Sequence, residues 1–94
     1  MDVIVDEHAF KHGLSEDDIR YAWDNYVRKQ HRGSPNEGTA VAVGYDMRGR
    51  LIQIVAVDRP LGVLIYHAMT PPTRNVLFEL GLLKGRGPWR TRKC

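Results

Sequence analysis

The sequence predicts an α+β domain in which N-terminal helices precede an antiparallel meander of three to four strands and a C-terminal helix closes the chain. Three observations predict this class. A capped amphipathic pattern lies near the start, β-rich runs separated by turn residues fill the middle, and prolines open an apolar helical pattern after them. Helices and strands segregated along a chain in this way favour helices packed on one face of an antiparallel sheet.

The N-terminal part carries two helix signals after a short β-prone run at 3–5. In the first, Asp6 can cap a helical turn and Gly13 can end it in the left-handed conformation. In the second, Ser15 stands three residues before Asp18, which is the spacing of a capping box. The apolar residues behind this box recur at helical spacing and predict an amphipathic helix over roughly 15–28. These residues are Ile19, Ala22, Trp23, Tyr26 and Val27.

The middle of the chain predicts a loop and then strands joined by short turns. The segment 29–38 contains Gly, Ser, Pro and Asn, which are typical of a loop. The predicted strands are 39–46, 51–57 and 63–69, and the predicted turns are 47–50 and 58–62. Gly49 suits a positive φ in the first turn. Because side chains alternate along a strand, His67 is expected on the same face as Ile65 and Met69.

The last helix is predicted to begin after the third run. Thr70 can cap it, and the prolines that follow suit a first turn, where backbone amides have no partner. Its apolar face is formed by Val76, Leu77, Leu80 and Leu83. Residues 1–84 are thus expected to form one domain, and 85–94, which contain several helix breakers and bases, a flexible tail.

The charge distribution indicates where an anionic partner would bind. The 94 residues are 43% apolar and 27% charged, with a formal net charge of +3. Nine of the eleven acidic residues lie at or before Asp46, so the C-terminal third is basic. Its bases after Arg74 are Lys84, Arg86, Arg90, Arg92 and Lys93. This cationic stretch is predicted to attract phosphates and other polyanions; the alternative is a tail that only adds solubility.

Several features predict a cytoplasmic protein without a membrane partner. Cys94 is the single cysteine, so no disulfide forms within the chain. No apolar run approaches the roughly 18 residues that span a bilayer. The first residues lack the basic and apolar regions of a signal peptide.

Motifs for several chemistries are missing from the sequence. It contains no glycine-rich phosphate loop, no Cys-x-x-Cys pair and no serine nucleophile elbow. His8 and His12 are four residues apart and would share a helix face, but no third metal ligand is evident. Surface histidines at a helix end are the favoured interpretation, and no metal or other cofactor is predicted.

The remaining candidates are cations and imidazoles, which suit cleavage of a phosphodiester without a metal ion. They are Lys11, His12, Arg50, Arg59, His67 and Arg74. Histidine can act as base or acid near neutral pH, and arginine matches phosphate oxygens with a planar fork. A lone histidine at a strand end is more often structural, and arginines beside turns are often simply solvated, so the residues by themselves indicate only a small basic domain with a nucleic-acid partner.

The sequence resembles the BrnT family of bacterial toxins, which belongs to the RelE-like group of type II toxin–antitoxin systems. Three stretches carry the resemblance: "VDEHAFKHGLSEDDIRYAWDN" (5–25), "GYDMRGRLIQIVAV" (44–57) and "GVLIYHAMTPPTR" (62–74). The resemblance covers about 3–83. It departs from the family pattern where His67 replaces an arginine at the end of a strand and Ala68 replaces the basic residue after it.

The resemblance implies an RNA endonuclease that inhibits translation and is neutralised by an antitoxin, a small DNA-binding protein. On this interpretation His67 acts as acid or base, Arg50 and Arg74 stabilise the phosphate, and Lys11 and His12 assist from a helix end. The RNA backbone would be held by Arg59 and by the C-terminal bases Lys84, Arg86, Arg90, Arg92 and Lys93. RNA, free or bound to the ribosome, is the expected substrate. The alternative function is a non-catalytic module that binds a protein or nucleic acid and leaves RNA whole.

Overall fold

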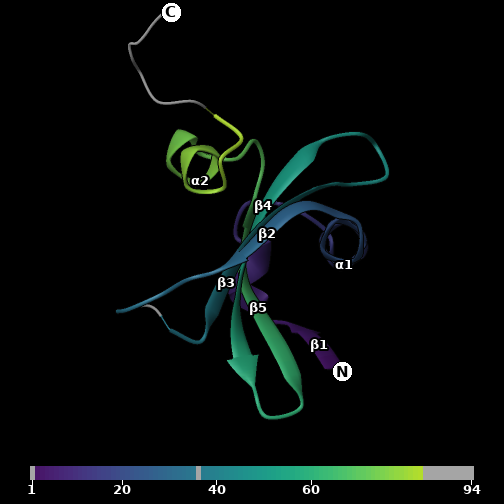
Figure 1. The fold of residues 1–94 in the computed structure, drawn as a ribbon. Coiled ribbons are helices and arrows are strands. Elements are labelled where there is room, and N and C mark those ends of the chain that lie inside the picture. Colours follow the sequence, from purple (N-terminus) through teal and green to yellow (C-terminus); the bar gives the residue numbers. More distant parts are fainter. Residues whose placement is uncertain (1, 36, 84–94) are drawn as a thin grey trace, which may run out of the picture.

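The computed structural model describes residues 2–35 and 37–83 and contains one five-stranded sheet with helices on both of its faces (Figure 1). The strand order across the sheet is β1-β5-β4-β3-β2. In chain order the elements are β1 (Asp2–Val5), the 3-10 helix η1 (Glu7–Phe10), α1 (Glu16–Asp24), β2 (Tyr26–His31), β3 (Thr39–Tyr45), β4 (Leu51–Arg59), β5 (Gly62–Met69) and α2 (Arg74–Glu79). The predicted α+β class is confirmed.

The sheet is mixed, whereas a wholly antiparallel sheet was expected. Strands β2 to β5 pair antiparallel with their neighbours in chain order. Strand β1 instead pairs parallel with β5 and places Val3 beside Val63. Backbone hydrogen bonds at both ends of β1, from Asp2 N to Leu61 O and from Asp6 N to Ile65 O, fix this edge. The N-terminal strand therefore delivers η1 directly to the side of β5.

The two faces of the sheet bury separate apolar clusters. The larger cluster lies under η1 and α1, where Ala9, Ile19 and Trp23 pack on Ile54 and Ile65. The smaller lies on the opposite face, where α2 packs through Val76 and Leu80. Its sheet residues are Val41, Val43 and Val55. The helices were expected on one face, and that prediction was wrong, because alternate residues of β3 and β4 are apolar on both faces.

The predicted helix over 15–28 ends early, and its last residues join the sheet. Ser15 caps α1, since its Oγ accepts a hydrogen bond from Asp18 N at 3.1 Å. The helix ends at Asp24, and Asn25 leaves the helical conformation while its Nδ2 donates to Tyr21 O at 2.9 Å. Residues 26–31 then pair with β3 as the edge strand β2. Cross-strand pairing thus overrides the helical spacing of Tyr26 and Val27, and the predicted loop is shorter than 29–38.

A register shift in β5 changes which residues share a face with His67. Ile65 pairs with Ala56, but His67 pairs with Val55, so Tyr66 is an extra residue in the ladder. This bulge turns Ile65 toward the larger cluster and His67 toward the opposite face. The expectation that His67 shares a face with Ile65 was therefore wrong.

Helix α2 is capped by Thr73. The prediction that Thr70 caps it was wrong. Thr73 Oγ1 accepts a hydrogen bond from Val76 N at 3.2 Å. The Thr70 hydroxyl instead donates to Leu51 O at 2.6 Å, which ties the end of β5 to the start of β4. No helix within the described residues has both the length and the apolar character needed to cross a membrane.

Candidate functional site

A cleft of about 490 Å³ lies between the end of η1 and the sheet face that carries His67. We call it the η1 cleft. Its polar lining comes from four parts of the chain that are distant in sequence, namely the η1 region, the end of β2, β4 and β5. These lining residues are His8, Lys11, His12, Arg32, Gln53, Tyr66 and His67.

Local sequence explains how η1 presents its basic residues. Asp6 accepts hydrogen bonds from His8 N at 3.1 Å and from the His8 ring at 2.8 Å. The side-chain hydrogen bond from His8 is the main cause that holds the pKa of Asp6 below its usual value. Ala9 is fully buried, whereas Lys11 and His12 on the other side of the turn are exposed. Gly13, at φ +83°, then turns the chain toward α1.

His67 lines the cleft and is half-buried. Its ring lies edge-on to the ring of His12, with 5.7 Å between centroids and an interplanar angle of 77°. Its Nε2 lies 3.1 Å from Nε2 of Gln53, a nearly buried β4 residue. Gln53 Oε1 in turn accepts hydrogen bonds from the N–H and the hydroxyl of Thr73. A chain of hydrogen bonds therefore joins the start of α2 to the ring of His67.

Burial lowers the pKa of His67 below 6.5, and the neighbouring His12 lowers it further. The neutral ring is thereby favoured at neutral pH, because a buried imidazolium loses hydration and meets a like charge. The neutral ring can serve as a base or as a single N–H donor. The site thus holds one histidine whose environment favours the uncharged form.

This lowered pKa predicts a loss of stability in mild acid. Between the folded pKa of His67 and about 6.5, the unfolded chain binds more protons than the native state, so stability falls as the pH drops through that range. Asp6 and Asp46 also have lowered pKa values, but their contribution is lost only as the pH falls below about 3.8. We expect wild type to lose more stability between pH 7 and pH 5 than His67→Gln, as measured by urea denaturation. Equal losses of stability in the two proteins would show that His67 does not cause this pH dependence.

Arg32 and Tyr66 also line the cleft. Arg32 forms a two-point ion pair with Glu79 of α2, with Nε–Oε2 at 2.9 Å and Nη2–Oε1 at 3.0 Å. Hydrogen bonding to Glu79 raises the pKa of Arg32, so its charge is permanent and already compensated. Arg32 therefore fixes the position of α2 beside the cleft and adds little net positive charge to it.

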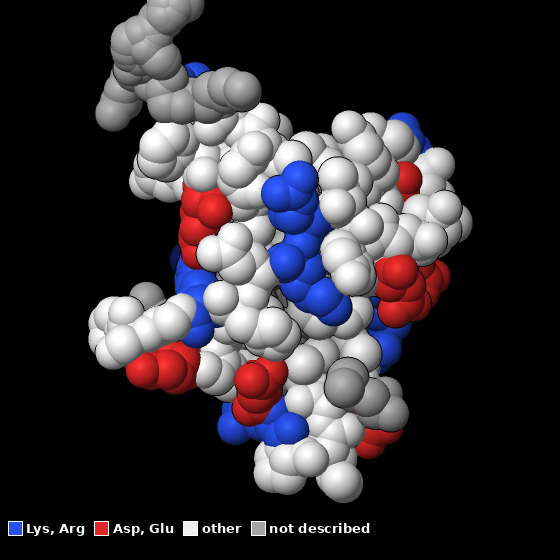
Figure 2. Space-filling view, viewed as in Figure 1, with Lys and Arg blue, Asp and Glu red and all other residues white. Residues whose placement is uncertain are grey.

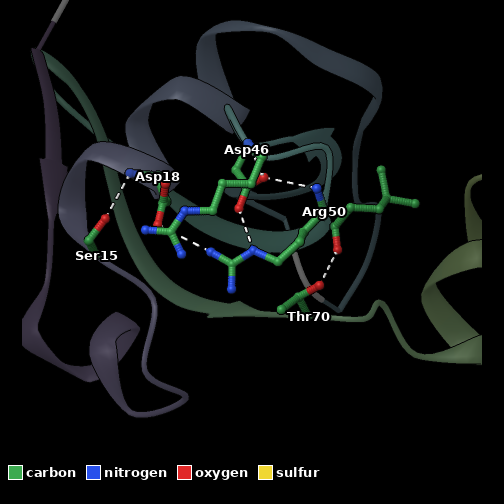
Figure 3. A network of polar contacts seen from close by, with 7 residues as sticks. Ser15, Asp18, Asp46, Arg50 and Thr70 are labelled. Carbon is green, nitrogen blue, oxygen red and sulfur yellow. Dashed lines mark hydrogen bonds and ion pairs between the residues drawn. The ribbon is translucent and has the colours of Figure 1, made fainter.

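Arg50, which was expected to stabilise phosphate beside His67, lies in a different network (Figure 3). Its Nε donates to the buried Asp46 at 2.7 Å, and its Nη2 donates to Asp18 at 3.3 Å. Burial alone would raise the pKa of Asp46, but hydrogen bonds from Arg50 and Arg48 lower it below its usual value. The two carboxylates hold the β3–β4 turn against α1, and Arg50 does not line the η1 cleft.

The other predicted site residues are also distributed away from the cleft. Arg59 lines a second hollow, of about 410 Å³, beside Trp23, Lys29 and His31. Arg74 is exposed at the start of α2 and lines neither hollow. The predicted RNA-binding residues Lys84, Arg86, Arg90, Arg92 and Lys93 lie outside the described residues.

A basic surface that the sequence interpretation missed lies along the edge strand β2. Figure 2 shows Lys and Arg side chains in a stripe over the part of the molecule where β2 runs in Figure 1. β2 contributes Arg28, whose Nη1 donates to Leu80 O at 3.0 Å, and Lys29. The Lys29 ammonium lies 4.5 Å from the ring centroid of Trp23 and 4.4 Å from that of Tyr26. These residues had been assigned to a helix end and a loop.

Three of the five predicted catalytic residues, Lys11, His12 and His67, therefore come together in the η1 cleft. His8, Arg32, Gln53 and Tyr66 join them and were not predicted. Within residues 2–35 and 37–83, no group of three or more His, Cys, Asp or Glu side chains is placed to hold a metal ion. No family model matches the chain, and neither the curated proteins nor the solved structures contain a significant match to it.

Proposed function

We propose that this chain is the toxin of a type II toxin–antitoxin system and that it cleaves RNA in the η1 cleft without a metal ion. The observation that carries the proposal is the convergence of Lys11, His12 and His67 from separate elements on one cleft. Imidazoles and an ammonium are sufficient for phosphodiester cleavage by internal transfer, because that reaction needs proton transfer and stabilisation of negative charge. The BrnT resemblance supplies the biological role in this proposal.

Each step of the reaction has a matching group in the cleft. The 2′-oxygen loses its proton and forms a bond to phosphorus, while the bond from phosphorus to the 5′-oxygen breaks and that oxygen gains a proton. The products are a 2′,3′-cyclic phosphate and a 5′-hydroxyl. The exposed ring of His12 can take the proton from the 2′-hydroxyl and give it to the leaving 5′-oxygen, and His67 lies beside it in the cleft. Lys11 attracts the phosphate, and no carboxylate among the described residues pairs with it.

The basic stripe along β2 and the predicted cationic tail would bind the RNA backbone outside the cleft. The same positive surface would attract acidic segments of an antitoxin, so one electrostatic feature accounts for both partners. We also propose that the protein acts in the cytoplasm, where RNA and an antitoxin would both be present.

The direct test is RNA cleavage by the purified protein. Free RNA with chelator present and ribosomes programmed with mRNA are the two substrates, since a ribosome-dependent enzyme leaves free RNA intact. We expect cleavage of at least one substrate, with 2′,3′-cyclic phosphate ends, and at least a tenfold loss for His67→Ala. His31→Ala is the matched control, because His31 is exposed and lines the second hollow.

If both free RNA and ribosome-bound mRNA stay intact, the proposed nuclease activity is contradicted. A mobility shift without cleavage would instead favour the alternative function, a non-catalytic module that binds RNA. One observation favours that alternative. Nε2 of His67 already forms a hydrogen bond with Gln53, so this nitrogen is not available to accept a proton from RNA.

A further inference from the structure

The orientation of the Gln53 amide is fixed by its contacts with Thr73. Gln53 Oε1 lies 2.9 Å from Thr73 N and 3.1 Å from Thr73 Oγ1. A backbone N–H can only donate, so the atom that faces Thr73 must be the amide oxygen. The Thr73 hydroxyl accepts from Val76 N and is thus free to donate to the same oxygen. Because Gln53 is only 5% exposed, the flipped amide would leave buried donors facing each other.

The fixed amide determines where His67 carries its proton. The NH2 group of Gln53 faces Nε2 of His67 at 3.1 Å, and an amide NH2 can only donate. Nε2 must therefore offer its lone pair, which places the proton of the neutral ring on Nδ1. A protonated ring would direct an Nε2–H group at the NH2 group and lose this hydrogen bond.

We propose that Gln53 is a positioning residue that locks His67 in the Nδ1–H tautomer, so that His67 presents an N–H donor to an anionic phosphate in the η1 cleft. The use of this donor on RNA rests on the proposed function, whereas the tautomer itself does not. Proton transfer then belongs to His12, the exposed ring next to it. His67 would hold a phosphate oxygen during the reaction, and that role needs a donor of fixed direction.

The groups that face His67 from the surrounding elements favour the same state. His12, His8 and Lys11 approach from the η1 region, and they carry or can acquire positive charge. Arg32, which directly follows β2, and Tyr66 of β5 also line the cleft. Two carboxylates are bonded to residues that line the cleft, Glu79 to Arg32 and Asp6 to His8. Among the described residues, no carboxylate forms a hydrogen bond with the His67 ring, so none stabilises its protonated form.

Nitrogen NMR of the histidine rings tests the tautomer directly. The unprotonated nitrogen of a neutral imidazole resonates far downfield of the protonated one, and comparison with His67→Gln assigns the signals of His67. We expect Nε2 to be unprotonated and Nδ1 to carry the hydrogen at neutral pH. The Thr73 amide should titrate with the same midpoint as the ring, because Gln53 connects them. An Nε2–H ring, or comparable populations of both tautomers, would overturn the proposal.

Two variants separate positioning from simple packing. In Gln53→Glu the carboxylate accepts from both neighbours, so the proton should move to Nε2 and the His67 titration should shift to higher pH. In Gln53→Met the side chain keeps its length but loses both polar atoms, and the ring should populate both tautomers. If either folded variant keeps the ring nitrogen spectrum of wild type, Gln53 does not set the tautomer.

Inorganic phosphate is the probe for the donor role. Its addition should shift the Nδ1–H resonance of His67 and leave the ring signals of His31 unchanged; no shift at millimolar phosphate would refute that role. The outcomes distinguish the two proposals. An Nδ1–H ring in a protein that leaves RNA intact would end the nuclease proposal alone. Cleavage by a protein with an Nε2–H ring would end the positioning proposal alone.

Discussion

Gly44→Ala is expected to lower the stability of the folded protein more than any other small substitution that we consider. Gly44 lies buried in β3, directly under the junction of α1 and β2. An added Cβ would overlap the carbonyl oxygen of Ala22 and lie 3.0 Å from its carbonyl carbon and 3.1 Å from Tyr26 Cα. All of these atoms belong to backbone, so no side-chain rotation can relieve the overlap.

The expected cost is about 1–3 kcal/mol or more, which is a large part of the stability of a small domain. For a chain of this size, that loss corresponds to a fall in Tm of roughly 5–20 °C. Thermal unfolding followed by circular dichroism measures it. Gly33→Ala is the matched control, because nothing lies within 4 Å of its added Cβ and its φ is not positive. Equal Tm values for the two variants would show that α1 does not pack on β3 as described.

Sequence patterns predicted those elements whose signals are local. The Ser15 cap, the positive φ of Gly49 and the three β-rich runs each depend on residues close in the chain, and all are present in the structure. Strand β2 was missed because Tyr26 and Val27 continue the helical spacing of α1. Its formation depends on pairing with β3, which is distant in sequence. Two β-prone residues directly after Asn25 were the available signal.

The candidate site was predicted only in part for a similar reason. His12 and His67 were selected by residue type, and the fold brings them together. Arg50 and Arg32 could not be distinguished by type, because the role of a guanidinium depends on which carboxylates lie near it. Asp46, four residues before Arg50 in a turn, was a readable sign that Arg50 is engaged there. The bulge at Tyr66 left no sign in the sequence, and it decides which face His67 occupies.

His12→Ala is the second substitution with a large expected effect, and it bears on activity instead of stability. His12 is exposed and makes no hydrogen bond with the described residues, so its loss should leave Tm nearly unchanged. As the group to which we assign proton transfer, it should contribute roughly 10²–10⁴-fold to the rate. Because a purely structural histidine would change Tm and activity together, the separation of the two effects is the informative result.

The decisive measurement is the rate of RNA cleavage by wild type, His12→Ala and His31→Ala under the conditions in which wild type is active. We predict a fall of roughly 10²–10⁴-fold for His12→Ala and a rate close to that of wild type for His31→Ala, with all three proteins folded. A His12→Ala protein that cleaves RNA as fast as wild type would contradict the assignment of proton transfer to His12 and the reaction that we propose for the η1 cleft.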